Sequence, residues 1–420
     1  MSPAQPILGA ASGYVRHDGR WDDLERLRTS SPMYDATIDE IDGRRIRIGD
    51  HWLSDFASCN YLGFDLEPEI IDSIGVEVRR WGTHPSWSRL LGNPAPYPRI
   101  EERLTELLGA PDTLVFPTVT HIHMSVMPIL AGHGQIFLDS QAHKTIYDGC
   151  AYARGLGATL QRFRANDPDH LHELLRGAPT GQTRLVAMDG VNSMTGNAPD
   201  IARFAAICRE FDALLYLDDA HGFGLLGERR PDELSPYGCR GNATVRYGGE
   251  TYDNIVLVGG FSKAYSSLMA FLALPTWLKN HLKVAAPPYL YSGPVPTASL
   301  ATVLAGMDVN EKRGDVIRAD LHRKSRKILD HVRALGVFTP NAGDTPIVEL
   351  PLAAGQDIQQ VGQYLWDKGI YVTLAAYPLV PRDQIGFRVQ VTAANTDAEI
   401  EQLNEVLSDL AGERRLREAR

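Results

Sequence analysis

The chain has 420 residues, a formal net charge of −10 and a sequence pI of about 5.7. This acidic balance gives no reason to expect nucleic acid or an anionic membrane surface as a partner. Hydrophobic residues make up 44% of the chain, enough for a sizeable core, and the length favours two or three structural units. The sequence lacks a signal-peptide pattern at its start, and no apolar run reaches the ~18 residues of a membrane-spanning helix.

The cysteines favour a reducing compartment. The four of them, at positions 59, 150, 208 and 239, are widely and irregularly spaced. They form neither a metal-ligand pair nor a dense disulfide framework. We therefore expect a cytoplasmic protein.

Residues 1–60 are predicted to form an N-terminal arm and a hairpin. A helix is expected near residues 21–27, and the stretch 37–56 reads as a hairpin whose turn contains Gly43. From about residue 100 helical spacing alternates with short apolar runs, at 113–116, 135–138, 185–188, 214–217 and 255–258. Such runs between helices predict a mostly parallel sheet covered on both faces. We assign residues 61–295 to this large α/β domain.

The last 125 residues have a different character. A long helix is predicted over 296–335, followed by strands at 345–350, 370–374 and 387–392 with a helix between them. The chain ends on an amphipathic helix that begins at a capping box, Thr396 to Glu399. Residues 296–420 are therefore expected to form a smaller α+β domain.

Four segments place reactive residue types just beyond a predicted strand, where ligands bind in parallel sheets. They carry Asp218 with His221, Lys263, His143 and Ser193. Each residue alone also suits an ordinary role, because an aspartate can cap a helix, a lysine can serve solubility and a serine can form a turn. Together, however, these residues indicate a cofactor site. A lysine that forms an imine and an acid that keeps a pyridine nitrogen protonated are what pyridoxal phosphate requires.

Six segments of the sequence resemble those of a known enzyme family. The segments that carry the resemblance are ASCNYLGF (57–64), SRLLGN (88–93), LDDAHGFGLLG (217–227), GGFSKA (259–264), PYLYSGPVP (288–296) and FRVQVTAANT (387–396). They are similar to the α-oxoamine synthases, pyridoxal-phosphate enzymes of fold type I, over about residues 40–410. The resemblance implies a large, mostly parallel-sheet cofactor domain and a smaller α+β C-terminal domain.

The resemblance also implies roles for individual residues. Lys263 would hold pyridoxal 5'-phosphate as a Schiff base and act as acid and base at the substrate α-carbon. Asp218 would pair with the pyridine nitrogen, His221 would bind the phenolic oxygen with Ser193 nearby, and His143 would stack on the ring. Thr118, Val119 and Ser262 would bind the phosphate. Arg388 would bind the substrate carboxylate, which suits a bidentate guanidinium, and Ser88 and Asn60 would also contact substrate.

The chain departs from the family around the phosphate and the substrate. The usual Ser-Gly-x-x-Ala-Asn segment is replaced by residues 117–123, which lack the glycine and carry His121 and His123. We expect no metal at this His-x-His pair, because no third ligand is evident. Substrate or ring contacts are favoured, with one of the two on a helix surface. The usual threonine before the lysine motif is Gly260.

These departures leave the catalytic residues intact, so they favour an altered substrate and a specialised biosynthetic pathway. The implied reaction is a Claisen-type condensation of an amino acid with an acyl thioester, followed by loss of carbon dioxide to give an α-amino ketone. The acyl group would arrive on coenzyme A or on an acyl carrier protein.

Two other interpretations stay open at this stage. One is another fold type I activity, such as transamination or aldol-type cleavage, and the other is a non-catalytic partner subunit. The resemblance further implies a homodimer, in which residues 291–293 would reach the partner's cofactor phosphate.

Overall fold

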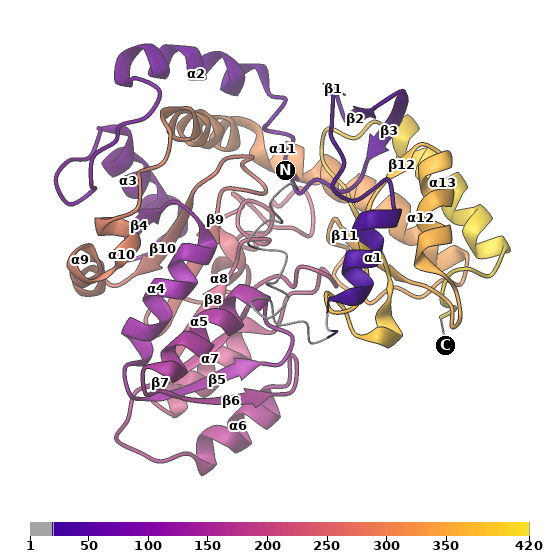
Figure 1. The fold of residues 1–420 in the computed structure, drawn as a ribbon. Helices are drawn as coiled ribbons and strands as arrows, with labels where there is room; N and C mark the ends of the chain where they lie inside the picture. Colours follow the sequence, from indigo (N-terminus) through magenta and orange to yellow (C-terminus); the bar gives the residue numbers. More distant parts are fainter. Residues whose placement is uncertain (1–18, 20, 420) are drawn as a thin grey trace, which may run out of the picture.

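A computed structural model describes residue 19 and residues 21–419 of the chain. The first 18 residues of the predicted N-terminal arm lie outside the described residues. Figure 1 shows a large α/β part built mainly from the middle of the chain, with a smaller part beside it. The smaller part combines the N-terminal strands with the C-terminal helices and strands. The division proposed at residues 60 and 295 stays a prediction.

A seven-stranded sheet organises the large part, in the order β4-β10-β9-β8-β7-β5-β6. Its strands are β4 (Asp112–Phe116), β5 (Gln135–Asp139), β6 (Thr159–Phe163), β7 (Arg184–Asp189), β8 (Leu214–Asp218), β9 (Ile255–Gly260) and β10 (Ala270–Leu274). Among these strands β10 runs antiparallel to both neighbours, and the others share one direction. The predicted, mostly parallel sheet is therefore confirmed.

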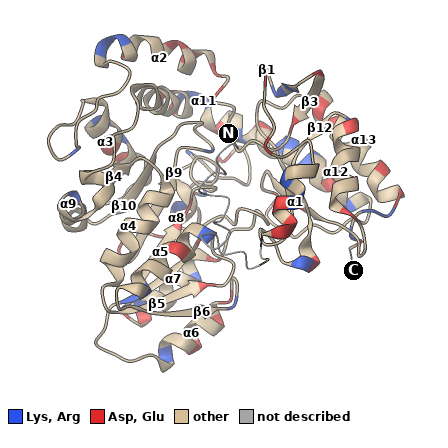
Figure 2. Cartoon of the chain, in the orientation of Figure 1, with Lys and Arg blue, Asp and Glu red and all other residues tan. Residues whose placement is uncertain are grey.

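Helices cover both faces of this sheet, since alternate residues along each strand point to opposite sides. One face packs against α4 (Val119–Ala131), α5 (Lys144–Gly155), α9 (Thr276–Ala285) and α10 (Pro287–Leu290). The other packs against α3 (Pro96–Leu108), α6 (Pro168–Gly177), α7 (Ile201–Glu210), α8 (Ala243–Tyr247) and the long α11 (Thr297–Ala334). Helix α2 (Pro68–Trp81) lies along α11. In Figure 2 the strands of the sheet are mostly free of charged residues, which sit mainly on helices and loops.

The smaller part contains two further sheets. Strands β1 (Glu40–Asp42), β2 (Arg45–Ile48) and β3 (His51–Asp55) form the predicted hairpin with one additional strand. Strand β12 (Ile370–Tyr371) joins β3 in parallel, while β13 (Thr373–Ala375) pairs with β14 (Gly386–Gln390) and β14 pairs with β11 (Ile347–Pro351). Helices α1 (Asp22–Ser30), α12 (Ile358–Asp367) and α13 (Asp397–Gly412) complete this part.

Two predictions about strands need correction. The expected strand over 370–374 is divided between two sheets at Val372, because its first residues pair with β3 and its last with β14. Strands β6 and β10 were not predicted. None of the described helices is long and apolar enough to cross a membrane.

Candidate active site

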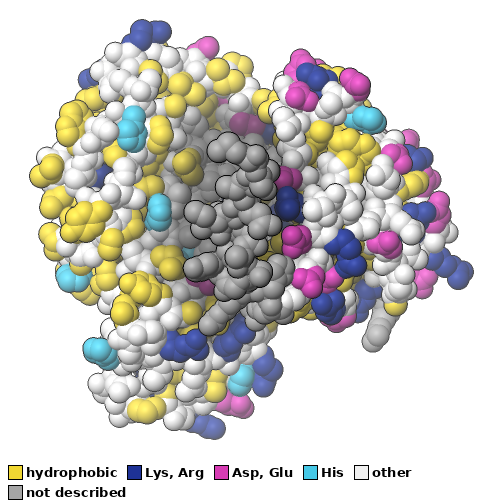
Figure 3. All heavy atoms as spheres, viewed as in Figure 1, with side chains coloured by type: hydrophobic (Ala, Val, Ile, Leu, Met, Phe, Trp, Pro, Cys, Tyr) yellow, Lys and Arg dark blue, Asp and Glu magenta, His cyan; other side chains and the backbone are white. Residues whose placement is uncertain are grey.

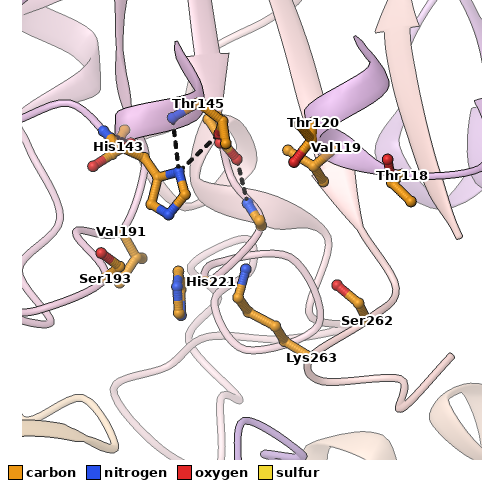
Figure 4. A pocket seen from close by; sticks show the side chains of 13 residues that line it. Thr118, Val119, Thr120, His143, Thr145, Val191, Ser193, His221, Ser262 and Lys263 are labelled. Atoms are coloured by element: carbon orange, nitrogen blue, oxygen red, sulfur yellow. Dashed lines mark hydrogen bonds between the residues drawn. The ribbon is translucent and has the colours of Figure 1, made fainter. Parts of the chain in front are cut away.

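The strands with a shared direction end at one edge of the large sheet, and a cavity opens there (Figure 4). Each of β4, β5, β7, β8 and β9 contributes the residues that follow its last position. The lining residues are Thr118, Val119, Thr120, His143, Thr145, Asp189, Val191, Ser193, Asp218, Ala220, His221, Ser262 and Lys263. The structure thus brings together all eight residues predicted to bind the cofactor.

Lys263 lies in the turn that leads from β9 into β10, and its side chain is half-buried. The backbone N–H of Phe261 donates to the carbonyl of Met269, and Ser266 N–H donates to the Lys263 carbonyl. These bonds close the turn tightly around the lysine. Figure 4 shows the Lys263 amine pointing into the cavity near His221. An amine held in this way is placed to react with a carbonyl compound.

Asp218 ends β8 and is 6% exposed. Its Oδ1 accepts the Ala220 N–H at 3.0 Å, and Nε2 of His123 lies 2.8 Å from its Oδ2. Burial by itself would raise the pKa of this carboxyl, but His123, the charge of Lys263 and the Ala220 N–H together lower it to about 2. Asp218 is therefore a carboxylate at neutral pH, as a partner of a protonated pyridine nitrogen must be.

His221 is buried on the turn after β8. The hydroxyl of Tyr61 lies 2.8 Å from its Nδ1 and 3.2 Å from Oε1 of the buried Gln390. Nε2 is therefore the ring nitrogen left for a ligand in the cavity. Burial, with the positive charges of Lys263 and Arg388, holds the pKa of His221 well below its usual range. The ring is neutral at physiological pH and suited to binding a phenolic oxygen.

His143 caps helix α5 from the opposite side of the cavity (Figure 4). Its Nδ1 lies 2.8 Å from the Thr145 hydroxyl, and its backbone N–H donates to Oδ1 of Asp189 at 3.1 Å. Burial is the main cause that lowers the pKa of His143, although Asp218 opposes it. The ring is thus fixed by its neighbours and uncharged, which suits the predicted stacking.

The predicted phosphate site lies at the N-terminus of α4. Thr118 caps this helix by accepting the His121 N–H, and Ser262 approaches from the β9 side (Figure 4). Unpaired N–H groups at a helix start attract anions. Gly260, which replaces the family's threonine, has a local reason. A Cβ there would lie 3.1 Å from Cγ2 of Val119, so the glycine makes room for the valine that stands at the helix start.

Arg388 reaches the site from β14 and does not itself line the cavity. Its Nη1 donates to the Ser193 carbonyl at 2.6 Å, which ties the small sheet to the loop after β7. Nε is buried and has no hydrogen-bond partner among the described residues. Glu349 lies directly opposite Arg388 on β11 and is 2% exposed. Burial raises the pKa of Glu349 to about 7, although Arg388 opposes the shift.

Two predicted substrate residues lie away from this cavity. The Ser88 hydroxyl donates to the Leu290 carbonyl at 2.8 Å, which joins the loop after α2 to the end of α10. The Asn60 side chain donates to Asp65 at 3.0 Å. The structure of one chain therefore does not bring Ser88 or Asn60 together with the other site residues, and their substrate role stays a prediction.

The two histidines of the departing segment lie on α4, not on a strand. Residues two apart on a helix point to different sides. His121 is exposed, whereas His123 is fully buried and meets Asp218. Within residues 21–419, no group of three or more histidine, cysteine or acidic side chains is arranged to hold a metal ion.

Sequence reasoning missed several residues of the site. Asp189 ends β7 as Asp218 ends β8, so the same pattern of an acid after an apolar run would have found it. Burial, with Asp218 nearby, raises the pKa of Asp189 well above its usual range. Tyr61 stands in the ASCNYLGF segment, but its contact with His221 spans 160 positions and has no local signal.

The lining fits pyridoxal phosphate. An ionised Asp218, a neutral His221, a lysine amine and a capped helix start lie around one cavity. These groups match the ring nitrogen, phenolic oxygen, aldehyde and phosphate of this cofactor in chemistry. This match is judged from the chemical groups that the chain itself places around the cavity.

Comparison with known proteins identifies relatives that also belong to a pyridoxal-phosphate enzyme family. The family described as aminotransferase class I and II matches residues 56–407. The 8-amino-7-oxononanoate synthase of Chromohalobacter salexigens is 33% identical over 356 residues, which cover 84% of this chain and 88% of that protein. A putative 8-amino-7-oxononanoate synthase of Desulforudis audaxviator is 32% identical over 348 residues, covering 82% and 86%.

Solved structures support the fold. Serine palmitoyltransferase of Sphingomonas wittichii matches with a TM-score of 0.84 at 23% identity, covering 97% of this chain and 98% of that one. The 8-amino-7-oxononanoate synthase of Francisella tularensis matches with a TM-score of 0.71 at 19% identity, covering 86% and 98%. The predicted fold type I architecture is confirmed. The chain belongs to the aminotransferase class I and II family and, within it, to the α-oxoamine synthases.

Proposed function

We propose that this α-oxoamine synthase is a pyridoxal-phosphate-dependent C-acyltransferase. It condenses an amino acid with an acyl thioester, releases the thiol and carbon dioxide, and leaves an α-amino ketone. The observation that carries the proposal is the convergence of Lys263, Asp218, His221 and His143 on one cavity, with Arg388 held beside it. The relatives named as 8-amino-7-oxononanoate synthases support the same type of reaction.

Each residue of the site has its own role in the proposed reaction. Pyridoxal phosphate, when bound, supplies a ring that accepts the electrons of a carbanion at the substrate α-carbon. Asp218, held as a carboxylate, would bind the ring nitrogen, and His221 would present Nε2 to the phenolic oxygen. Lys263 would take the α-proton, and His143 would stack on the ring and assist proton transfer. Arg388 binds the substrate carboxylate through its guanidinium.

The alternatives are less well supported. A non-catalytic subunit has no need of a lysine and an ionised, buried aspartate that line the same cavity, and both are present here. An aminotransferase or aldolase would use the same cofactor groups, so the structure of the site does not separate it from an acyltransferase. The named relatives favour acyl transfer.

Two measurements on the purified protein test the proposal. Borohydride reduction followed by peptide mapping is expected to give a pyridoxyl adduct on Lys263. Amino acids are then paired with acyl-coenzyme A and with acyl carrier protein thioesters, and thiol release is followed with a chromogenic reagent. Stoichiometric release of thiol and carbon dioxide is expected. Amino-group transfer to a keto acid without thiol release would instead identify an aminotransferase.

We further propose a homodimer. The exposed apolar side chains Trp87, Leu90 and Leu91 lie in the loop after α2, and Tyr291 follows α10 at 83% exposure. The Ser88–Leu290 hydrogen bond places these side chains in one region. Figure 3 shows many hydrophobic side chains over the large part of the molecule. A large exposed apolar patch is typical of a protein interface, and a partner on this patch would bring residues 291–293 and Ser88 toward a second active site.

Two finer proposals concern the substrate and the cellular compartment. The altered segment around the phosphate supports a substrate other than that of the named relatives, in a specialised biosynthetic pathway. Each of the four cysteines is free, which supports a reducing, cytoplasmic setting.

A further inference from the structure

His123 lies at the centre of a buried hydrogen-bonded chain behind the cavity. It is fully buried on α4, with Nε2 2.8 Å from Oδ2 of Asp218 and Nδ1 2.8 Å from the hydroxyl of Tyr216. Tyr216 stands on β8, two residues before Asp218, and is also fully buried. These hydrogen bonds therefore connect the core of the sheet to the carboxylate at its edge.

The direction of each hydrogen bond follows from the chemistry of its partners. An ionised carboxylate only accepts, so Nε2 carries the proton that faces Asp218. Burial raises the pKa of Tyr216 well above its usual range, so its hydroxyl keeps its proton and donates to Nδ1. The three side chains then act as hydrogen-bond partners for one another without any water. Buried polar groups require such partners.

The position of His123 is fixed by packing as well. Helices α4 and α5 approach closely at Gly149, where a Cβ would lie 2.4 Å from the His123 carbonyl oxygen. The backbone that carries the imidazole thus has little room to shift. With Oδ1 held by the Ala220 N–H and Oδ2 by His123, the plane of the Asp218 carboxylate is set from two sides.

We propose that His123 is a positioning residue of the cofactor site, which orients Asp218 and keeps it ionised so that the pyridine nitrogen of pyridoxal phosphate stays protonated. The histidine does not line the cavity. It acts through the aspartate, and Tyr216 acts in turn by fixing the imidazole. The inference rests on the proposed binding of pyridoxal phosphate at Lys263.

The test compares two substitutions at position 123. H123F keeps a planar ring and removes the donor, whereas H123Q restores an N–H near the place of Nε2. The readouts are the ¹⁵N resonance of ring-labelled pyridoxal phosphate in the loaded protein and the cofactor affinity of the stripped protein. H123F is expected to move the resonance toward its unprotonated position and to weaken affinity about tenfold, the loss of one hydrogen bond to a charged group. H123Q is expected to restore most of both.

The outcomes separate this inference from the cofactor assignment. A wild-type protein without a pyridoxyl adduct on Lys263 would overturn both. An adduct in the wild type, with an unchanged ring-nitrogen resonance in a folded H123F protein, would overturn the role of His123 alone, as would equal damage from H123Q. If circular dichroism shows that H123F does not fold, Y216F decides. It is expected to shift the resonance in the same direction by a smaller amount, and no shift would count against the proposal.

Discussion

Arg388 is tied to the cavity through the Ser193 carbonyl, so its guanidinium is fixed before any substrate arrives. Its Nε has no hydrogen-bond partner among the described residues, and two parallel N–H groups give a guanidinium a geometry that an ammonium lacks. This makes the side chain more specific than a simple positive charge. The conservative substitution by lysine is therefore informative.

We predict that R388K raises KM for the amino acid about 10- to 100-fold, since the loss of a hydrogen bond to a charged group costs about 1.5–3 kcal/mol. KM for the acyl thioester should change little. Thiol release, measured with each substrate varied in turn, checks this split. R382K, at an exposed arginine, is the control. Equal increases in both KM values would contradict a carboxylate role.

The residues that reasoning from sequence could find are those that follow a strand. Lys263, Asp218 and His143 each come after a run of apolar residues, and the parallel sheet brings such positions together. The contacts of His123 and Tyr61 could not be found in this way, because they join positions 95 and 160 residues apart. They depend on how α4 and the N-terminal segment pack, and neither packing has a local pattern.

At the scale of elements, the prediction missed two strands: β6, which lies at an edge of the large sheet, and β10, a buried run of five residues between β4 and β9. Strand β6 is at the end of the sheet and mostly exposed, so its sequence lacks the apolar run that marks its neighbours. The long helix α11 was predicted to within one residue at each end. Pro296 precedes it and Gly336 follows shortly after its end, and these residues are typical of helix boundaries.

The pairing of β11 with β14 buries Glu349 opposite Arg388 and makes stability depend on pH. Because burial raises the pKa of Glu349 to about 7, its protonated form is favoured in the folded protein. Its contribution to stability is thus full below its ordinary pKa of 4.5 and is lost as pH rises through about 7. The loss amounts to at most about 3 kcal/mol.

We predict that E349Q, which has no proton to lose, gains stability relative to the wild type as pH rises from 5 to 8. Thermal unfolding of both proteins at the two pH values measures the difference. E405Q, at an exposed position on α13, controls for the loss of a negative charge. A difference between E349Q and the wild type that is the same at pH 5 and pH 8 would show that this carboxyl does not titrate as described.

For the whole molecule, the exposed apolar loop makes the state of assembly testable. Leu91 is 82% exposed, so a charge there costs an isolated chain little but is costly inside an interface. We predict that L91E sediments as a monomer and loses activity, because Ser88 and residues 291–293 no longer reach a second site. V316E, at a 60% exposed position on α11, should remain dimeric. An active L91E monomer would contradict the shared site.

The parallel pairing of β3 with β12 has a consequence for synthesis on the ribosome. Ser54 pairs with Ile370, and these residues lie about 300 positions apart. At about 5–20 residues per second, roughly 15–60 s pass between their emergence. During that interval the first three strands lack their neighbour, while all the strands of the large sheet emerge, the last of them ending at Leu274. We therefore expect the cofactor-binding sheet to form first and the N-terminal strands to dock last.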